Sequence, residues 1–150
     1  MSRFLIRNGR LLDPWNDVDR ECDVLVEDGR ISAIAPDAEI RGAELFDASG
    51  CWVTPGFIDM HCHFREPGQE YKEDLASGGR AAVAGGFTSV ACMANTNPVN
   101  DDPSVTDFII GQARQGSPAR VYPIAAATRG LAGEVMTEMS ALRDAGAVAF

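Results

Sequence analysis

Residues Gly56–Arg65 read Gly-Phe-Ile-Asp-Met-His-Cys-His-Phe-Arg, and they open a pattern of strand, loop and helix that repeats along the chain. The apolar start of this stretch predicts a strand over Gly56–Phe64. A helix from about Gln69 to Gly85-Gly86 and a second strand over Phe87–Met93 follow. Such units imply parallel strands in one sheet, with the helices packed against it.

The later units are a helix over Ser104–Gln115, a strand over Arg120–Ala126, a helix over Glu134–Asp144 and a strand from Ala147. No Gly-x-Gly-x-x-Gly turn follows the first strand, which argues against a doubly wound nucleotide-binding sheet. We therefore expect an α/β fold, the N-terminal part of a (β/α)8 barrel of the TIM type. A complete barrel needs about 250 residues, so we expect it to continue beyond Phe150.

The first fifty residues follow another pattern, with short strands predicted at Phe4–Ile6, Asp23–Glu27 and Ile31–Ala35. Asp28-Gly29 between the last two is a strong hairpin signal. We thus expect two domains: a small β-rich domain over residues 1–52, and the first half of the barrel over residues 53–150.

The composition is that of a folded globular protein, with 45% hydrophobic and 23% charged residues. The formal net charge is −9 and Lys72 is the sole lysine, which argues against a nucleic-acid partner. No apolar run has the length of a membrane span or a secretory signal, so the cytoplasm is the expected location and no membrane partner is expected. The four cysteines are widely spaced, and we expect them to be reduced thiols.

The two histidines of the chain, His61 and His63, stand at the end of the first barrel strand. Side chains alternate along a strand, so both imidazoles and Arg65 are expected on one side. The other side is expected to carry Met60, Cys62 and Phe64. Neutral imidazole is a common zinc ligand, and two on a rigid strand supply half of a usual coordination shell. We therefore predict His61 and His63 as metal ligands, while a coincidental or merely packed pair remains the alternative.

A second polar stretch, Met93–Asp101, follows the neighbouring strand. Its Asn, Pro and Asp residues are also what an ordinary turn uses. The carboxyl ends of neighbouring barrel strands open onto the same face, so an amide from Asn95 could bind a substrate carboxylate together with Arg65. Cys62 is expected to face away from this site as a small buried hydrophobe.

The stretch from Pro55 to Gly68, with Glu73-Asp74 and Gly85-Gly86-Phe87-Thr88, resembles the longer type of bacterial dihydroorotase, a family of the amidohydrolase superfamily. The resemblance implies a metallohydrolase barrel after a small β-rich domain. It implies zinc, one or two ions, held by His61 and His63. It matches Arg65 and Asn95 to substrate-carboxylate contacts. One departure is Ala94, where the family usually has proline.

The implied reaction is the reversible hydrolysis of dihydroorotate to N-carbamoyl-aspartate in pyrimidine biosynthesis. The general base, an aspartate on the last barrel strand, and a metal-binding aspartate on the fourth strand are expected beyond Phe150, so the 150 residues alone are expected to be inactive. Alternatives are an allantoinase or dihydropyrimidinase, a metal-binding or interaction fragment, and a non-catalytic structural partner of aspartate transcarbamoylase. A homodimer, or association with aspartate transcarbamoylase, is the expected kind of assembly.

Overall fold

A computed structural model describes residues 2–35 and 42–150 of the chain. The chain forms two compact units, Met1–Pro55 and Gly56–Phe150. The boundary between them falls after Pro55, whereas the sequence pattern placed it after residue 52. Among the described residues, no helix is both long and apolar enough to cross a membrane.

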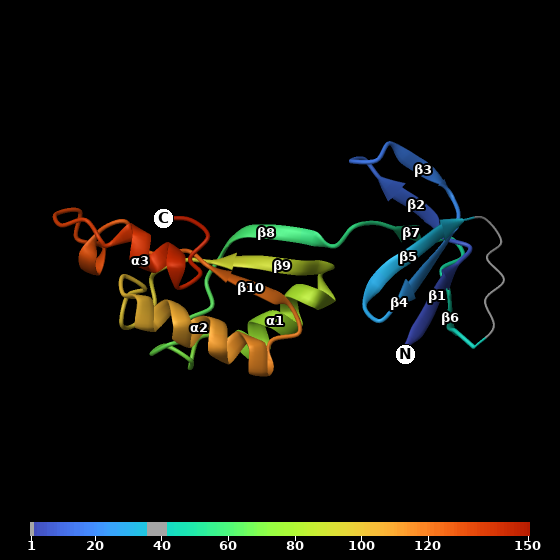
Figure 1. The fold of residues 1–150 in the computed structure, drawn as a ribbon. Helices are drawn as coiled ribbons and strands as arrows, with labels where there is room; N and C mark the ends of the chain where they lie inside the picture. The colour runs from blue at the N-terminus through green and yellow to red at the C-terminus, as the bar shows by residue number, and fades with distance from the viewer. Residues whose placement is uncertain (1, 36–41) are drawn as a thin grey trace. The chain divides into compact units, whose positions relative to one another are not determined.

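The first unit is built of short strands in two sheets (Figure 1). One sheet has the order β5-β4-β1-β6, and its strands are β1 (Arg3–Arg7), β4 (Asp23–Glu27), β5 (Arg30–Ala35) and β6 (Glu44–Asp47). The other has the order β3-β2-β7, and its strands are β2 (Arg10–Asp13), β3 (Val18–Glu21) and β7 (Trp52–Val53). The three strands predicted here correspond to β1, β4 and β5. The other four were not predicted.

The turn between β4 and β5 shows why this pair could be predicted. Asp28 and Gly29 both have positive φ angles, 49° and 77°. Two such residues form a turn whose twist matches that of the flanking strands, and Asp-Gly tolerates this conformation well. β4 pairs with β5 in antiparallel fashion on one side and with β1 on the other. Apolar side chains of this unit, Leu11, Cys22 and Val24, form its buried cluster.

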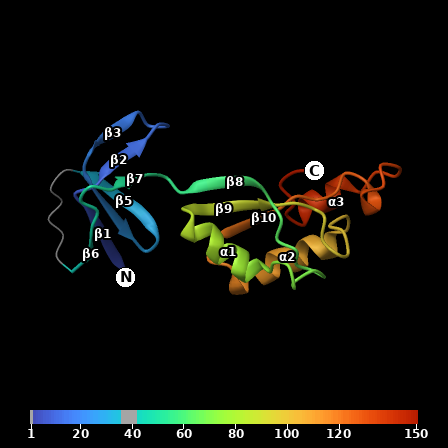
Figure 2. The same cartoon turned by 180° about the vertical axis from the view of Figure 1, so that it is seen from behind.

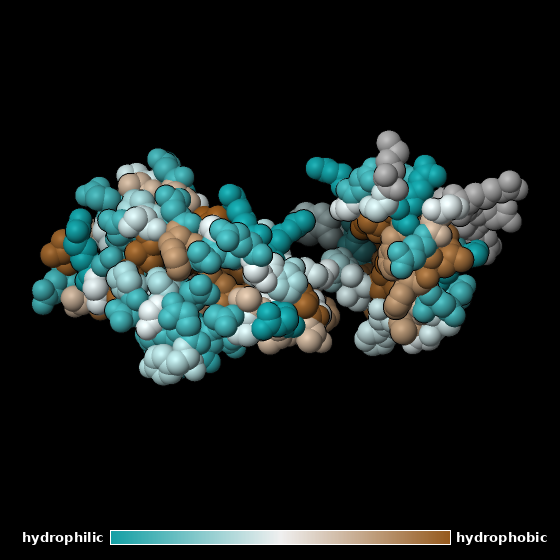
Figure 3. All heavy atoms as spheres, turned by 90° about the horizontal axis from the view of Figure 1, so that it is seen from below, coloured by the Kyte–Doolittle hydropathy of each residue, from teal (hydrophilic) through white to brown (hydrophobic). Residues whose placement is uncertain are grey.

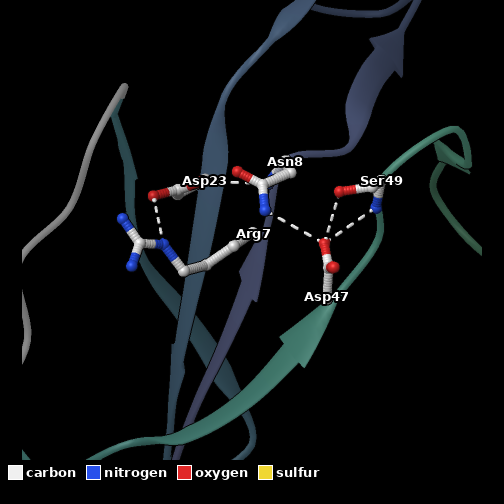
Figure 4. A network of polar contacts seen from close by, with 5 residues as sticks. All are labelled: Arg7, Asn8, Asp23, Asp47 and Ser49. Carbon is white, nitrogen blue, oxygen red and sulfur yellow. Dashed lines mark hydrogen bonds and ion pairs between the residues drawn. The ribbon is translucent and has the colours of Figure 1, made fainter.

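A polar network joins β1, β4 and β6 at one end of their sheet (Figure 4). Asp23 is buried and lies 3.4 Å from Arg7 Nε, and its Oδ1 accepts a hydrogen bond from the Asn8 backbone. The Asn8 side chain donates to Asp47 Oδ1, which also accepts from the backbone and the hydroxyl of Ser49. Hydrogen bonds from Ser49, and then from Asn8, lower the pKa of Asp47. The network fixes the point where the chain leaves β1 and β6.

The second unit contains a parallel sheet in the order β10-β9-β8, made of β8 (Phe57–Cys62), β9 (Phe87–Cys92) and β10 (Arg120–Pro123). Two helices connect these strands, α1 (Leu75–Ala84) and α2 (Pro103–Gly116). Both helices lie on one face of the sheet, as the views from the front and from behind show (Figures 1 and 2). The predicted units of parallel strand and helix are therefore present.

The core of this unit lies between the sheet and the two helices. Its buried members are Phe64, Leu75, Val90, Cys92, Val105, Ile109 and Ala113. The surface seen from below, on the helix side, is mostly hydrophilic, with apolar side chains scattered among the polar ones (Figure 3). Packed glycines bring the layers close, since a Cβ at Gly78 would lie 2.4 Å from the Phe64 ring. Gly78 therefore lets α1 pack closely against the Phe64 ring.

Several predicted boundaries were wrong. The first helix begins at Leu75 rather than near Gln69, because Asp74 and Ser77 form a capping box there. The last helix, α3 (Met139–Asp144), begins five residues after Glu134, since positive-φ glycines shape a 3-10 turn, η1 (Arg129–Leu131), and the loop after it. The strand expected from Ala147 is a single parallel bridge between Ile124 and Ala149.

Candidate metal and substrate site

The two histidine side chains lie together at the carboxyl end of β8. Their ring centroids are 5.2 Å apart and their planes meet at 67°. Both side chains are exposed, on the side of β8 away from the buried core. The structure thus brings the two predicted metal ligands next to each other.

His63 is held by the loop that follows β9. Its Nδ1 lies 2.8 Å from Oδ1 of Asn95, a residue 32 positions later in the chain. With the Asn95 carbonyl oxygen as acceptor, the tautomer that satisfies this contact carries its proton on Nδ1 and has the Nε2 lone pair available. A carboxylate or carbonyl partner of this kind is the usual orienting contact of a metal-binding imidazole. The pair of imidazoles is therefore prepared to bind a metal through Nε2 of His63.

Asn95 was predicted to bind substrate, and in the structure its side chain contacts His63. Its Oδ1 is engaged by His63, while its amide nitrogen remains a donor. Among the described residues, no hydrogen bond or ion pair joins a side chain to the Arg65 guanidinium, which is half-buried in the loop after β8. The Arg65 guanidinium and the Asn95 amide nitrogen are thus hydrogen-bond donors in the loops that follow two neighbouring strands, β8 and β9.

The loop carrying Arg65 is tied down on both sides. Glu66 accepts a hydrogen bond from the backbone of Leu75 at 2.9 Å, which joins the loop to the start of α1. The Asn97 backbone donates to the Pro67 carbonyl at 2.9 Å. Gly68 has a φ of 90°, and a Cβ there would lie 1.8 Å from the Asn97 carbonyl oxygen, so the two loops touch through their backbones.

Asn100 anchors the second of these loops and was read in the sequence only as part of a turn. It is fully buried, and its side chain donates to the Ile124 carbonyl at 3.0 Å and accepts from the Thr106 hydroxyl at 2.7 Å. Its backbone bonds to Ala94 and Ala126. These contacts fix the β9 loop against the end of β10. The sequence offers no signal that separates Asn100 from the asparagines before it.

Met60, Cys62 and Phe64 were predicted to share one side of β8, and the structure differs from this prediction at Met60. Cys62 and Phe64 do face the core, and burial raises the pKa of the Cys62 thiol to about 11. Met60 does not join them, because it is 77% exposed. The register with β9 shifts between Asp59 and Cys62, so the strand contains a bulge that breaks simple alternation. The Asp59 carboxylate accepts a hydrogen bond from the His61 backbone at 3.0 Å across this bulge.

The donor set fits a metal only in part. No group of three or more His, Cys, Asp and Glu residues within residues 2–35 and 42–150 could hold an ion. Two exposed neighbouring imidazoles can supply two ligands, whereas zinc in a catalytic site takes three protein ligands or more. A metal ion held by these two imidazoles would need at least one further ligand.

Comparison with known proteins agrees with the sequence reading. The family model described as Dihydro-orotase-like matches residues 50–150. A dihydroorotase of Syntrophotalea carbinolica is 52% identical over 147 residues, and one of Solibacter usitatus is 54% identical over 146 residues. These alignments cover 98% and 97% of this chain, but 35% and 34% of the relatives. The chain therefore spans about a third of the length of these curated relatives.

Solved structures support the fold. An L-hydantoinase (dihydropyrimidinase) from Arthrobacter aurescens has a TM-score of 0.86 and 27% identity, over 100% of this chain and 32% of that one. A D-hydantoinase (dihydropyrimidinase) from Thermus sp. has a TM-score of 0.71 and 27% identity, over 94% and 30%. The predicted fold class is confirmed: the chain folds as the N-terminal part of a TIM-type α/β barrel, preceded in sequence by a small β-rich part.

Proposed function

The chain belongs to the dihydro-orotase-like family, and from that premise we propose that the protein is a zinc-dependent dihydroorotase of pyrimidine biosynthesis. Its reaction is the reversible hydrolysis of the cyclic amide of dihydroorotate to N-carbamoyl-aspartate. The observation that carries the proposal is the contact of His63 with Asn95, beside His61, at the carboxyl ends of β8 and β9. That end of the strands is where barrel enzymes place their active sites.

In this proposal His61 and His63 are two of the ligands of one or two zinc ions. When bound, zinc supplies Lewis-acid activation of water and of the amide carbonyl. The contact from Asn95 keeps Nε2 of His63 free to act as a ligand. The further ligands and the general base are proposed to lie on barrel strands beyond those described here.

Arg65 and Asn95 are proposed to hold the carboxylate of the substrate. A guanidinium matches a carboxylate with two parallel hydrogen bonds, and Arg65 has no side-chain partner among the described residues. The amide nitrogen of Asn95 would add a third donor. These contacts would orient the ring so that its scissile amide lies over the histidine pair.

A second candidate is a hydantoinase or dihydropyrimidinase, which the TM-score of 0.86 to such an enzyme favours. The sequence identity of 52% to a dihydroorotase, against 27% to the hydantoinase, supports the first proposal more strongly. Dihydrouracil is the same ring as dihydroorotate without the carboxylate. If Arg65 and Asn95 bind a carboxylate, a dihydroorotase should prefer dihydroorotate. A dihydropyrimidinase should instead prefer dihydrouracil.

The test is an assay of the whole protein, loaded with zinc, on dihydroorotate, dihydrouracil, hydantoin and allantoin. We expect turnover of dihydroorotate at least 100-fold above the others, because losing a charged partner of a polar site costs about three kcal/mol. Preference for dihydrouracil or hydantoin would support the second candidate. No turnover of any of them would support a non-catalytic partner, whose assembly as a homodimer or with aspartate transcarbamoylase can be measured by light scattering.

A further inference from the structure

The bulge in β8 has a defined place and size. Asp59 pairs with Val90 and Cys62 pairs with Cys92, so β8 uses three steps where β9 uses two. Val90 and Cys92 are both buried in the core under the helices. Paired residues of neighbouring strands point to the same side of a sheet. Asp59 and Cys62 therefore both point toward the helices, although an odd number of steps separates them.

This bulge decides where the histidines point. In a regular strand, residues 61 and 63 would share the side of Asp59, which faces the helices. The one extra residue reverses the alternation, so Cys62 and Phe64 take the helix side instead. His61 and His63 then lie on the opposite, exposed side. Without the bulge, His61 and His63 would face the helices if Asp59 kept its present side of the sheet.

The Asp59 carboxylate closes the bulge. Its Oδ1 accepts the hydrogen bond of the His61 backbone N–H at 3.0 Å, two residues on. Aspartate and asparagine stabilise bent backbone in this way, by occupying an N–H that the ladder leaves unpaired. Asp59 is half-buried and lines a cavity of about 200 Å³ together with Cys62, His63 and Ala81. Within it, the Asp59 carboxylate contacts the strand backbone through the His61 N–H.

We propose that Asp59 is a positioning residue for the metal site: its carboxylate oxygen holds the bulge that turns His61 and His63 away from the helices. It acts through the backbone of His61 and touches neither metal nor substrate. The part of this inference that concerns zinc rests on the proposed function. The part that concerns the bulge does not.

The test uses Asp59→Ala, Asp59→Asn and Asp59→Glu in the whole protein. Asparagine keeps an acceptor at the same position without the charge, whereas glutamate keeps the charge but moves the acceptor by one methylene. Asp13→Ala is the matched control, because Asp13 Oδ1 accepts from the Trp15 backbone at 3.1 Å in the same two-residue pattern in the first unit. Two quantities are measured: zinc affinity, by chelator competition with zinc alone, and amide hydrogen exchange of His61 in metal-free protein.

We expect the alanine and glutamate variants to bind zinc about 10- to 100-fold more weakly and to lose exchange protection at His61. The asparagine variant and the Asp13→Ala control should match the parent in both measurements. Parental zinc affinity in the alanine and glutamate variants, or equal weakness of the asparagine variant, would overturn the inference. If alanine prevents folding, the comparison of asparagine with glutamate decides in the same way.

Failure of the proposed function gives a different result. In that case the parent itself binds no zinc, while the exchange measurement still reports whether Asp59 holds the bulge. Unchanged protection of His61 in the glutamate variant would then reject the bulge assignment.

Discussion

The ring of His63 is held by a residue from the loop after β9, and this makes His63 the most informative single position of the site. Asn95 Oδ1 holds its Nδ1 at 2.8 Å, so Nε2 is left to bind metal. We expect His63→Ala to lower zinc affinity and dihydroorotate turnover together, each by about 100-fold or more, because solvent does not replace a fixed imidazole. Zinc content by elemental analysis and the turnover rate are measured on the same preparation. Full zinc content with parental turnover would make the histidine pair structural.

Arg65 tests the substrate side of the site separately. We expect Arg65→Lys to raise the KM for dihydroorotate about tenfold or more while zinc content stays at the parental value, because a point charge replaces a two-pronged donor. Arg80→Lys on the exposed surface of α1 is the control and should leave both quantities unchanged. An unchanged KM in Arg65→Lys would remove this residue from the carboxylate site.

Asn100 tests how the loop beneath the site is held. We expect Asn100→Ala to destabilise the second unit by about 2–4 kcal/mol, since it leaves the Thr106 hydroxyl and the Ile124 carbonyl without partners in a buried place. Asn97→Ala, in the same loop but exposed, should change stability by about 0.5 kcal/mol or less. Urea unfolding followed by circular dichroism measures both. Equal midpoints for the two variants would contradict the anchoring role.

At the scale of elements, the close approach of α1 to β8 can be tested with two glycines. A Cβ at Gly78 would lie 2.4 Å from Phe64 Cε1, whereas a Cβ at Gly111 in α2 meets nothing within 4 Å. We expect Gly78→Ala to destabilise by about 1–3 kcal/mol through overpacking. Gly111→Ala should stabilise by about 0.5–1 kcal/mol, because alanine favours a helix interior. Thermal unfolding of both variants should therefore shift in opposite directions, and two shifts of the same sign would refute the packing argument.

The helices and strands also show which elements can be predicted from sequence patterns and which cannot. β8, β9 and α2 were predicted because apolar runs of sufficient length stand between clear turn and capping signals. β2 and β3, four residues each, were not predicted, because Arg-Leu-Leu-Asp and Val-Asp-Arg-Glu carry too little alternation. Pairing with partners far along the chain stabilises such strands, for example β2 with β7. No local pattern reports these partners.

The candidate site was predictable to a similar degree. The spacing of His61 and His63 indicated two imidazoles on one side of a strand, and their rings do lie 5.2 Å apart. The same alternation failed for Met60, since it assumed a regular strand where the register shifts after Asp59. The contact between His63 and Asn95 joins two loops 32 residues apart. The sequence pattern predicted β8 and β9 as neighbours, but it does not show which side chains of the two loops meet.

At the scale of the whole molecule, the second unit leaves apolar surface that a complete barrel would cover. On the side of the sheet away from the helices, Ile58 is 66% exposed and Tyr122 39% exposed. A groove of about 590 Å³ runs along β10 and α2, with Ile110, Tyr122 and Val148 in its lining. Among the described residues, only the bridge from Ile124 to Ala149 pairs beyond β10 in this sheet. Exposed strand edges and apolar patches of this kind promote association.

We therefore expect residues 1–150, produced by themselves, to behave differently from the whole protein. The segment should self-associate at micromolar concentration and bind a hydrophobic dye, because Ile58, Tyr122 and the groove lining are exposed apolar surface. It should bind zinc at least about 100-fold more weakly than the whole protein, since two imidazoles supply only half of the ligands. It should also show no turnover of dihydroorotate. Size-exclusion chromatography with light scattering, dye fluorescence and zinc titration measure these properties. A monomeric segment that binds no dye would show that the exposed face needs no cover, and turnover by the segment alone would show that the site described here is already complete.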